Sequence, residues 1–417
     1  MDATTFDPST GREFIDRVRS LARHSDSDAH YTRAYLTPAH QAAARQIAEW
    51  MRAAGMAVRI DAVGSVIGRY EAAAPGTKTL LMGSHFDSVR NGGKYDGVLG
   101  ILVPIACLAE FHRRGERLPV AIEIAAFADE EGARFQTSFL ASRALVEGAA
   151  SLAPLLDRRD AEGITLAQAL RDAGLDPARA DGDRIDPGTL AAYVEIHIEQ
   201  GPVLLNAGRA LGVVTRIAAG TRHLLKVKGE AGHAGTVPMA MRHDALAAGA
   251  EMVLALEQHA AAGASLVATV GILKVRDGTG NVIPGEVEFT ADVRAPDGAT
   301  LAAGREAMFA ACHAIAKKRG VALEIVKTHE VEAAPCALRL QDRLAAAIER
   351  TVPGERAMRL PSGAGHDAMI LAKVTEVGMM FVRCGAGGVS HNPAETVSAD
   401  DAALAIAALL DFIRHFR

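Results

Sequence analysis

Four short segments of this chain place metal-binding side chains directly after apolar, strand-like stretches, and this repeated placement restricts the folds open to the sequence. The segments are Gly83–Asp87 with Asp96 shortly after it, Asp129–Gly132, Glu195–His197 and Ser390–Pro393. In open α/β sheets, ligands gather at the carboxyl ends of the strands. We therefore expect residues as distant in sequence as His85 and His391 to meet at one edge of a single sheet.

The remaining sequence favours a layered α/β fold. Apolar strand-like stretches at 79–82, 120–128 and 191–198 alternate with helical ones such as 97–114. Nearly continuous apolar strands are typical of a mainly parallel sheet covered by helices. Residues 12–55 are predicted to be helical, with Thr37 as the N-cap of a helix that stops at Gly55, and residues 151–190 to form a surface excursion.

A second pattern occupies residues 216–330. A strand, a helix, two strands, a helix and a strand are predicted at 222–229, 241–262, 266–275, 285–294, 301–319 and 323–330. This β-α-β-β-α-β order is the ferredoxin-like arrangement. We expect a small α/β domain at 216–330, inserted into a catalytic domain made of 1–215 and 331–417.

The composition excludes several functional classes. The chain has 417 residues and a net charge of -5 without a basic block, so we expect no nucleic-acid partner. No stretch is apolar enough for a membrane span, and Met1–Thr5 does not begin a signal peptide, so a cytoplasmic protein is expected. The four cysteines form no CxxC pair and are expected to be buried, reduced thiols.

The residue types at the strand ends suit metal-assisted hydrolysis. His85 and Asp87 point to the same side of an extended chain, so Asp87 can accept a hydrogen bond from His85 and orient its ring. Asp96 lies in a glycine-flanked loop at a predicted helix start, where it is either a helix cap or a carboxylate that bridges two ions. These residues favour a site for two divalent ions.

The neighbouring acids Glu130 and Glu131 allow a division of roles. One can bind metal while the other accepts a proton from a polarised water. A pair of adjacent glutamates is more often a solvated turn, and with 15 histidines in the chain single matches arise by chance. The joint placement of all these groups at strand ends is what favours a metal-dependent hydrolase.

Several longer motifs make the chain recognisable. They are Gly83–Ser88, Gly92–Gly97, Phe127–Phe135, His197–Pro202, Gly232–Gly235, Gly365–Ala368 and Ser390–Glu395. Over nearly its whole length the chain resembles the hydantoinase/carbamoylase family of amidases, within the group of dinuclear zinc peptidases and aminoacylases. Within that family it is most similar to N-carbamoyl-L-amino acid hydrolases, allantoate amidohydrolases and β-ureidopropionases.

The resemblance implies a dinuclear centre. His85, Asp96 and His197 would hold one ion, and Asp96, Glu131 and His391 the other, with Asp96 bridging. Zn²⁺ is the first expectation, and Mn²⁺, Co²⁺ and Ni²⁺ remain open. Glu130 would be the general base, supported by Asp87.

The resemblance also implies substrate contacts. His233 would polarise the scissile carbonyl from a partner subunit, so the inserted domain is expected to act as a lid and to form a homodimer. Asn281 and Arg294 would bind a substrate carboxylate. Further candidates are Gln200 and His223, and the glycine-rich loop with Gly363, Gly365 and His366.

The expected reaction is hydrolysis of the terminal ureido C–N bond of an N-carbamoyl-L-amino acid or a related ureido acid, with release of ammonia and carbon dioxide. The sequence does not choose among N-carbamoyl amino acids, allantoate and ureidopropionate as the small-molecule substrate. Two alternatives are an aminoacylase or peptidase acting on acyl amino acids, and a non-catalytic binding protein that keeps the fold.

Overall fold

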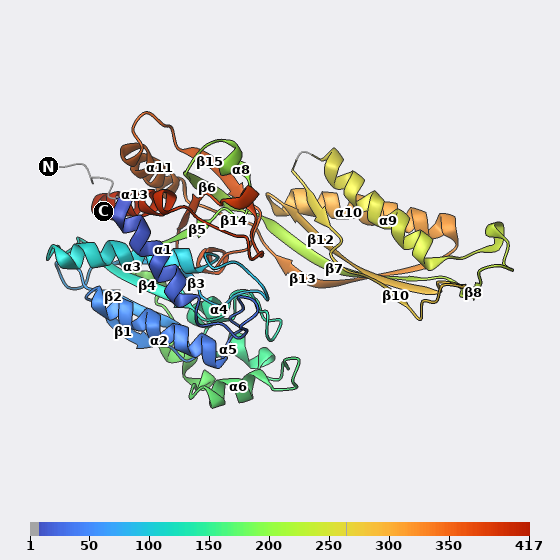
Figure 1. The fold of residues 1–417 in the computed structure, drawn as a ribbon, viewed down its shortest axis with the longest axis horizontal. Helices are drawn as coiled ribbons and strands as arrows, with labels where there is room; N and C mark the ends of the chain where they lie inside the picture. Colours follow the sequence, from blue (N-terminus) through green and yellow to red (C-terminus); the bar gives the residue numbers. More distant parts are fainter. Residues whose placement is uncertain (1–7, 264) are drawn as a thin grey trace. The chain divides into compact units, whose positions relative to one another are not determined.

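The computed structural model describes residues 8–263 and 265–417, which form two compact units (Figure 1). The larger unit contains the chain up to Thr215 and again from Pro335 to Arg417. The inserted unit contains Arg216–Ala334, four residues more at its end than the sequence pattern indicated. Its last strand, β13 (Ala322–Val331), and the three residues after it account for the difference.

A nine-stranded sheet forms the centre of the larger unit, in the order β1-β2-β4-β3-β5-β16-β6-β14, with β15 paired to β6. These strands are β1 (Ala57–Ile60), β2 (Val66–Tyr70), β3 (Thr79–His85), β4 (Ala121–Phe127), β5 (Leu190–Ile198), β6 (Leu211–Ile217), β14 (Ala334–Pro335), β15 (Met358–Ser362) and β16 (Val377–Val382). The four central strands, β4, β3, β5 and β16, run parallel, whereas β2 and β6 flank them antiparallel. The expected mainly parallel centre is therefore confirmed.

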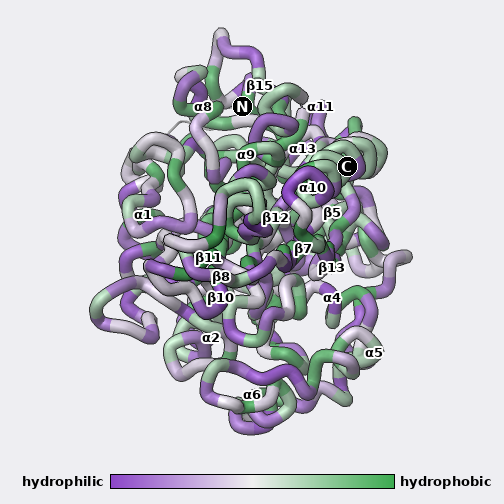
Figure 2. Tube along the Cα trace, turned by 90° about the vertical axis from the view of Figure 1, so that its right-hand side faces the viewer, coloured by the Kyte–Doolittle hydropathy of each residue, from purple (hydrophilic) through white to green (hydrophobic). Residues whose placement is uncertain are grey.

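Helices cover this sheet because its central strands are largely apolar and almost entirely buried. Every residue of β3 and of β16 is buried. The long helices are α1 (Pro8–Leu21), α2 (Pro38–Ala53), α3 (Val98–Arg113), α11 (Leu338–Thr351) and α13 (Ala399–His415). Helix α13 is drawn largely in green in Figure 2, and its N-cap Ser398 accepts a hydrogen bond from the backbone of Asp401.

Shorter helices fill the connections of the larger unit. They are α4 (Leu140–Glu147), α5 (Ala149–Leu152), α6 (Leu166–Asp172), α7 (Ala180–Asp183), α8 (Val203–Asn206) and α12 (Ala368–Leu371). Thr37 caps α2 as expected, by accepting a hydrogen bond from the backbone of His40. The expected helix across 12–55 is wrong for residues 22–37, which form an irregular segment held by hydrogen bonds of Ser25 and Asp26 to its own backbone.

The inserted unit has the strand order expected for a ferredoxin-like domain. Its elements are β7 (Ala219–Lys228), α9 (Ala245–Ala262), β9 (Val267–Thr269), β10 (Leu273–Arg276), β12 (Glu286–Ala295), α10 (Gly298–Arg319) and β13. The sheet order is β10-β12-β7-β13, with β9 also on β12, and every one of these pairs is antiparallel. The single strand expected at 266–275 is instead two short strands, β9 and β10.

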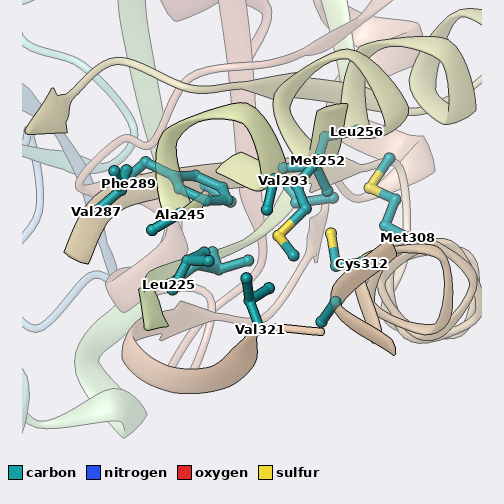
Figure 3. Close-up of a cluster of buried hydrophobic side chains, with 14 of the residues drawn as sticks. Leu225, Ala245, Met252, Leu256, Val287, Phe289, Val293, Met308, Cys312 and Val321 are labelled. Carbon is teal, nitrogen blue, oxygen red and sulfur yellow. The ribbon is translucent and has the colours of Figure 1, made fainter. Parts of the chain in front are cut away.

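Alternation along β12 builds the core of the inserted unit. Val287, Phe289, Ala291 and Val293 are buried, while the residues that alternate with them are only half-buried, as the two-residue period of a strand requires. Figure 3 shows these side chains gathered with Met252 of α9 and Met308 of α10. The helices therefore cover one face of this sheet.

A short two-stranded ribbon extends the inserted unit. Strands β8 (Gly232–His233) and β11 (Val282–Ile283) pair antiparallel, with His233 opposite Val282.

The four cysteines of the chain are free and buried, as expected. None of the described helices is long and apolar enough to span a membrane.

Candidate metal centre and active site

Five side chains predicted to bind metal lie together at the carboxyl ends of the central parallel strands. His85 ends β3 and His197 lies near the end of β5, whereas Glu131 follows β4, His391 follows β16 and Asp96 precedes α3. Because β4, β3, β5 and β16 are neighbours, the segments that follow them share one edge of the sheet. All five candidate ligands belong to the larger unit.

Asp96 is the centre of this group. Its Oδ1 atom lies 3.3 Å from Nε2 of His197 and 3.6 Å from Nε2 of His85. Its Oδ2 atom lies 3.2 Å from Nε2 of His391, which is also 3.4 Å from Oε1 of Glu131. The two oxygens of one carboxylate therefore face two different sets of ligands.

The arrangement fits a divalent transition metal. His85, Asp96 and His197 bring one ligand atom each to within 4.8 Å of one another, and so do Asp96, Glu131 and His391. Asp96 Oδ1 is buried but accepts no hydrogen bond from any residue that the structure describes. A buried carboxylate oxygen without a hydrogen bond is costly unless a cation compensates it, and imidazole and carboxylate donors suit Zn²⁺ and its neighbours.

Backbone carbonyls orient the two buried histidines. His197 Nδ1 lies 2.9 Å from the carbonyl oxygen of Ile198, and His85 Nδ1 lies 3.2 Å from the carbonyl oxygen of Asp87. Donation from Nδ1 leaves Nε2 of each ring directed at Asp96 and available to a metal.

The carboxylate of Asp87 has a wider role than the expected partnership with His85. Its Oδ1 is 3.3 Å from His85 Nδ1, but it also accepts the backbone N–H of Glu130 at 3.0 Å, and Oδ2 accepts that of Glu131 at 3.2 Å. Asp87 thus joins the end of β3 to the two glutamates that follow β4.

Burial and neighbouring charges shift the pKa values of the acids. Burial raises the pKa of Glu130 well above its usual range, and the charge of Glu131 raises it further. Burial, together with the charge of Asp96, raises the pKa of Glu131 to about 7. Burial also acts to raise the pKa of Asp96, but contacts with His197, His391 and His85 outweigh burial and hold that pKa well below its usual range.

Glu395 is part of this site although sequence reasoning gave it no role. Its Oε1 accepts the backbone N–H groups of Tyr95 at 3.0 Å and Asp96 at 3.1 Å. Its Oε2 accepts the hydroxyl of Ser390 at 2.8 Å. The only sequence signal was its position four residues after His391, within the last of the recognised motifs.

Gln200 lies beside the metal ligands. Its Nε2 donates to Asp96 Oδ2 at 3.1 Å and to the hydroxyl of Ser390 at 3.4 Å. Sequence analysis assigned Gln200 to the substrate, and the structure places its amide directly on the shared carboxylate.

A buried polar layer supports His197. The ring of His366 lies edge-on to that of His197, with centroids 4.5 Å apart. Glu195 accepts the hydroxyl of Ser84 at 2.7 Å and the backbone N–H of Ala368 at 3.0 Å. Sequence analysis placed neither His366 nor Glu195 behind a ligand.

The glycine-rich loop expected to contact the substrate is only partly exposed. Gly363 is exposed, whereas His366 is buried. A Cβ atom at Gly365 would lie 2.8 Å from the ring of Phe139, so this glycine permits close packing.

Arg33 is a second residue that sequence reasoning missed. It is fully buried, and its guanidinium donates to the carbonyl oxygens of Leu21, His24 and Phe86. Its backbone N–H donates to the hydroxyl of Ser88 at 2.8 Å. Arg33 therefore ties the irregular segment 22–37 to the turn that carries His85 and Asp87.

The remaining candidates belong to the inserted unit. His233 lies in β8 and Asn281 directly precedes β11, and the backbone N–H of Ala234 donates to the carbonyl of Asn281 at 3.0 Å. Arg294 on β12 contacts the carboxylate of Asp292 through Nε at 2.9 Å and Nη2 at 3.2 Å. His223 is buried on β7.

The position of His223 is that of a packing residue. Its side chain lies beneath α10, where its ring meets that of Phe309 edge-on with centroids 4.7 Å apart. Burial lowers its pKa, and the neighbouring Arg305 lowers it further. These surroundings keep the ring neutral and favour a structural role for His223 within the inserted unit.

Comparisons with known proteins show the family of this chain. Residues 75–415 match the Peptidase family M20/M25/M40. An allantoate deiminase from Arabidopsis thaliana is 39% identical over 433 residues, covering 96% of this chain and 81% of that protein. An N-carbamoyl-L-amino acid amidohydrolase from Geobacillus stearothermophilus is 41% identical over 374 residues, covering 89% of this chain and 90% of its own.

A solved structure of a similar protein has the same fold. The hydantoinase/carbamoylase family amidase from Burkholderia ambifaria superposes with a TM-score of 0.86 and 35% identity, covering 99% of this chain and 98% of that one. The resemblance inferred from the sequence motifs is therefore confirmed. This chain belongs to the Peptidase family M20/M25/M40, among its hydantoinase/carbamoylase amidases.

Proposed function

We propose that this protein is a metal-dependent amidohydrolase that cleaves the terminal ureido C–N bond of an N-carbamoyl-L-amino acid or a related ureido acid. The observation that carries the proposal is the shared carboxylate of Asp96, with one ligand set on each oxygen and the buried acid Glu130 beside them. The names of the relatives, N-carbamoyl-L-amino acid amidohydrolase and allantoate deiminase, favour small carbamoyl or ureido acids as substrates.

The proposed centre holds two divalent ions, with Zn²⁺ favoured and Mn²⁺, Co²⁺ or Ni²⁺ as alternatives. His85 and His197 complete one site and Glu131 and His391 the other, and Asp96 belongs to both. When bound, such ions supply Lewis-acid polarisation of a carbonyl oxygen and of water.

Glu130 is the proposed general base. Its raised pKa suits a group that takes a proton near neutral pH and then gives it back. It accepts a proton from the water whose oxygen adds to the ureido carbonyl carbon. It then passes that proton to the terminal nitrogen as the C–N bond breaks. Ammonia leaves, and the resulting carbamate loses carbon dioxide to give the amine.

The inserted unit is proposed to bind the rest of the substrate. Arg294 would exchange the carboxylate of Asp292 for that of the substrate, with Asn281 beside it. His233, which is exposed on the β8–β11 ribbon, would donate to the developing oxyanion. Closure of this unit as a lid would exclude water.

A homodimer through the inserted unit is part of the proposal. Most of the large apolar side chains that are exposed on the described residues belong to this unit, namely Met239, Met241, Leu254, Val267, Ile272, Leu273 and Val326. Exposed apolar groups gathered on one unit favour a protein–protein contact. In such a dimer His233 would act in the partner's active site.

The proposed compartment is the cytoplasm. All four cysteines are free and buried. Proteins of oxidising compartments more often pair their cysteines, so this pattern supports a reducing environment.

A substrate panel tests the proposed reaction. The protein, loaded with Zn²⁺ or Mn²⁺, is offered N-carbamoyl-L-amino acids, allantoate and 3-ureidopropionate beside N-acetyl amino acids and dipeptides, and ammonia and free amine are measured. We expect ammonia from at least one ureido acid, with kcat/KM on the order of a hundredfold above that for any acyl amino acid or dipeptide. Faster cleavage of dipeptides would establish a peptidase instead.

Removing the base should separate chemistry from metal binding. Glu130→Gln is expected to keep its full metal content and to lose about 10²–10⁴-fold in kcat, since the amide cannot accept the proton. Metal analysis and initial rates measure the two effects. Retention of normal turnover would exclude Glu130 as the base, and loss of metal would make it a ligand.

Removing the guanidinium should affect only substrates that carry a carboxylate. Arg294→Ala is expected to lower kcat/KM for a carbamoyl amino acid. The loss should correspond to about 2–5 kcal/mol of binding free energy, as for a charge pair that loses one partner. The matching carbamoyl amino acid amide should change little. Arg276→Ala, which removes an arginine paired with Glu288 in the same sheet, serves as the control. Equal losses on acid and amide substrates would contradict the assignment.

Metal binding should release protons. Contact with Asp96 raises the pKa of His391 to about 9, and the pKa of Glu131 is raised to about 7, so both ligands hold protons near neutral pH in the metal-free protein. Because metal requires the deprotonated ligands, apparent affinity should rise as the pH increases from about 6 to 8, with about one proton or more released.

Calorimetry in two buffers of different ionisation enthalpy measures this release. His391→Ala should release fewer protons than the unmodified protein. Binding heats that do not depend on the buffer would show that these ligands are already deprotonated.

A further inference from the structure

We propose that Glu395 is a positioning residue that fixes Asp96 and the His391 loop relative to each other, and thereby sets the affinity of the cation site formed by Asp96, Glu131 and His391. This inference rests on the proposed function, which supplies the cations. The side-chain hydrogen bonds of Glu395 go to two backbone N–H groups and to the hydroxyl of Ser390, and through these bonds it would position the ligands.

One carboxylate joins two segments that are far apart in the sequence. On one side, Oε1 of Glu395 accepts the backbone N–H of Asp96 itself, at 3.1 Å, and that of Tyr95, at 3.0 Å. On the other side, Oε2 accepts the hydroxyl of Ser390, the residue before His391, at 2.8 Å. Only 5% of Glu395 is exposed, so water competes little for these bonds.

The backbone around Glu395 makes the connection stiff. The N–H of Glu395 donates to the carbonyl of Asn392 at 3.0 Å, and the side-chain oxygen of Asn392 accepts the N–H of Ala394 at 2.9 Å. These bonds close the turn that follows His391. His391 itself has φ of 52°, a left-handed conformation that a residue other than glycine keeps only when its surroundings impose it.

Gly93 shows how closely the opposite loop approaches. A Cβ atom at Gly93 would lie 2.0 Å from Cδ and from Oε1 of Glu395. A side chain there must displace the carboxylate. The glycine therefore provides an independent way to disturb the contact without altering Glu395.

The two cation sites should respond differently when this contact is lost. His85 and His197 lie on strands, and their rings are oriented by backbone carbonyls. His391 lies on a loop, and 49% of its side chain is exposed. Loss of residues that orient metal ligands typically reduces metal affinity by about 10–100-fold. The site that contains His391 should therefore be the weaker of the two in a Glu395 variant.

The test compares metal binding by four variants of the full chain. Glu395→Ala removes the contact, and Gly93→Ala displaces it. Glu395→Gln keeps an acceptor for the two N–H groups and an amide that donates to Ser390. Asp61→Ala is the matched control, because Asp61 is also a buried carboxylate that accepts two backbone N–H groups, those of Val63 and Ser65.

Equilibrium dialysis against Co²⁺, with the visible spectrum of bound Co²⁺ as a second readout, measures each site, and circular dichroism confirms folding. In Glu395→Ala and Gly93→Ala we expect the second equivalent of Co²⁺ to bind about 10–100-fold more weakly, with the first changed less. Glu395→Gln and Asp61→Ala should bind both equivalents as the unmodified protein does.

Each other outcome has a distinct meaning. Unchanged binding of both equivalents in Glu395→Ala overturns the inference and leaves the proposed function intact. Equal weakening in Glu395→Gln and Glu395→Ala also overturns it, because the negative charge and not the positioning would then matter. If the unmodified protein binds fewer than two equivalents, the proposed dinuclear centre itself fails, and the failure is not specific to Glu395.

Discussion

The structure of the larger unit depends on how it accommodates the carboxylate of Asp96 in its interior. A charged group removed from water is unstable unless opposite charges or hydrogen bonds replace the lost hydration. Here three imidazoles face the two oxygens, and Gln200 donates to one of them. One oxygen still accepts no hydrogen bond from the described residues, which is the condition a cation would relieve.

The parallel sheet makes this concentration of charge possible. Its central strands are almost entirely buried, β3 and β16 at every residue, so their apolar side chains stabilise the unit independently of the site. The polar residues of the candidate site lie mainly where these strands end, although Glu195 is buried within β5. Asp87, Glu395 and Arg33 then connect the separate strand ends through backbone N–H and carbonyl groups. Ligand geometry is therefore set by hydrogen bonds between segments that are distant in the chain.

The difference between apolar strands, which are local, and hydrogen bonds between distant segments explains which features could be predicted from the sequence. The candidate ligands His85, Glu131 and His197 could be predicted because each directly follows or ends an apolar stretch, which is a local signal. Asp96 and the segment with His391 were noticed by the same placement, and the recognised motifs then implied which ion each would hold. The order of strands in the inserted unit was likewise predictable from local periodicity, since each helix and strand has its own pattern.

The residues that sequence reasoning missed act over long distances. Glu395 and Arg33 form hydrogen bonds to backbone groups of other segments. Such partners cannot be recognised from the sequence, because almost every residue carries the same backbone groups. For the same reason the local sequence predicts helix across 22–37, although Ser25 and Asp26 accept backbone N–H groups of this segment and Arg33 donates to a carbonyl in it, which holds an irregular path. The break between β9 and β10 also follows from pairing with β12, which the local sequence does not show.

The pairing of Arg294 with Asp292 bears on how the proposed enzyme would select its substrate. Both side chains are about one-third exposed, and an ion pair in such surroundings contributes only about 0–1 kcal/mol. Exchanging Asp292 for a substrate carboxylate therefore costs little. The contact nevertheless holds the guanidinium in one orientation, which reduces the entropy lost on binding. Asp292 would thus hold the guanidinium of Arg294 in the orientation that a substrate carboxylate needs. It would also repel any acid that does not displace it from Arg294. Selection would therefore depend on the geometry of the substrate and not on its charge alone.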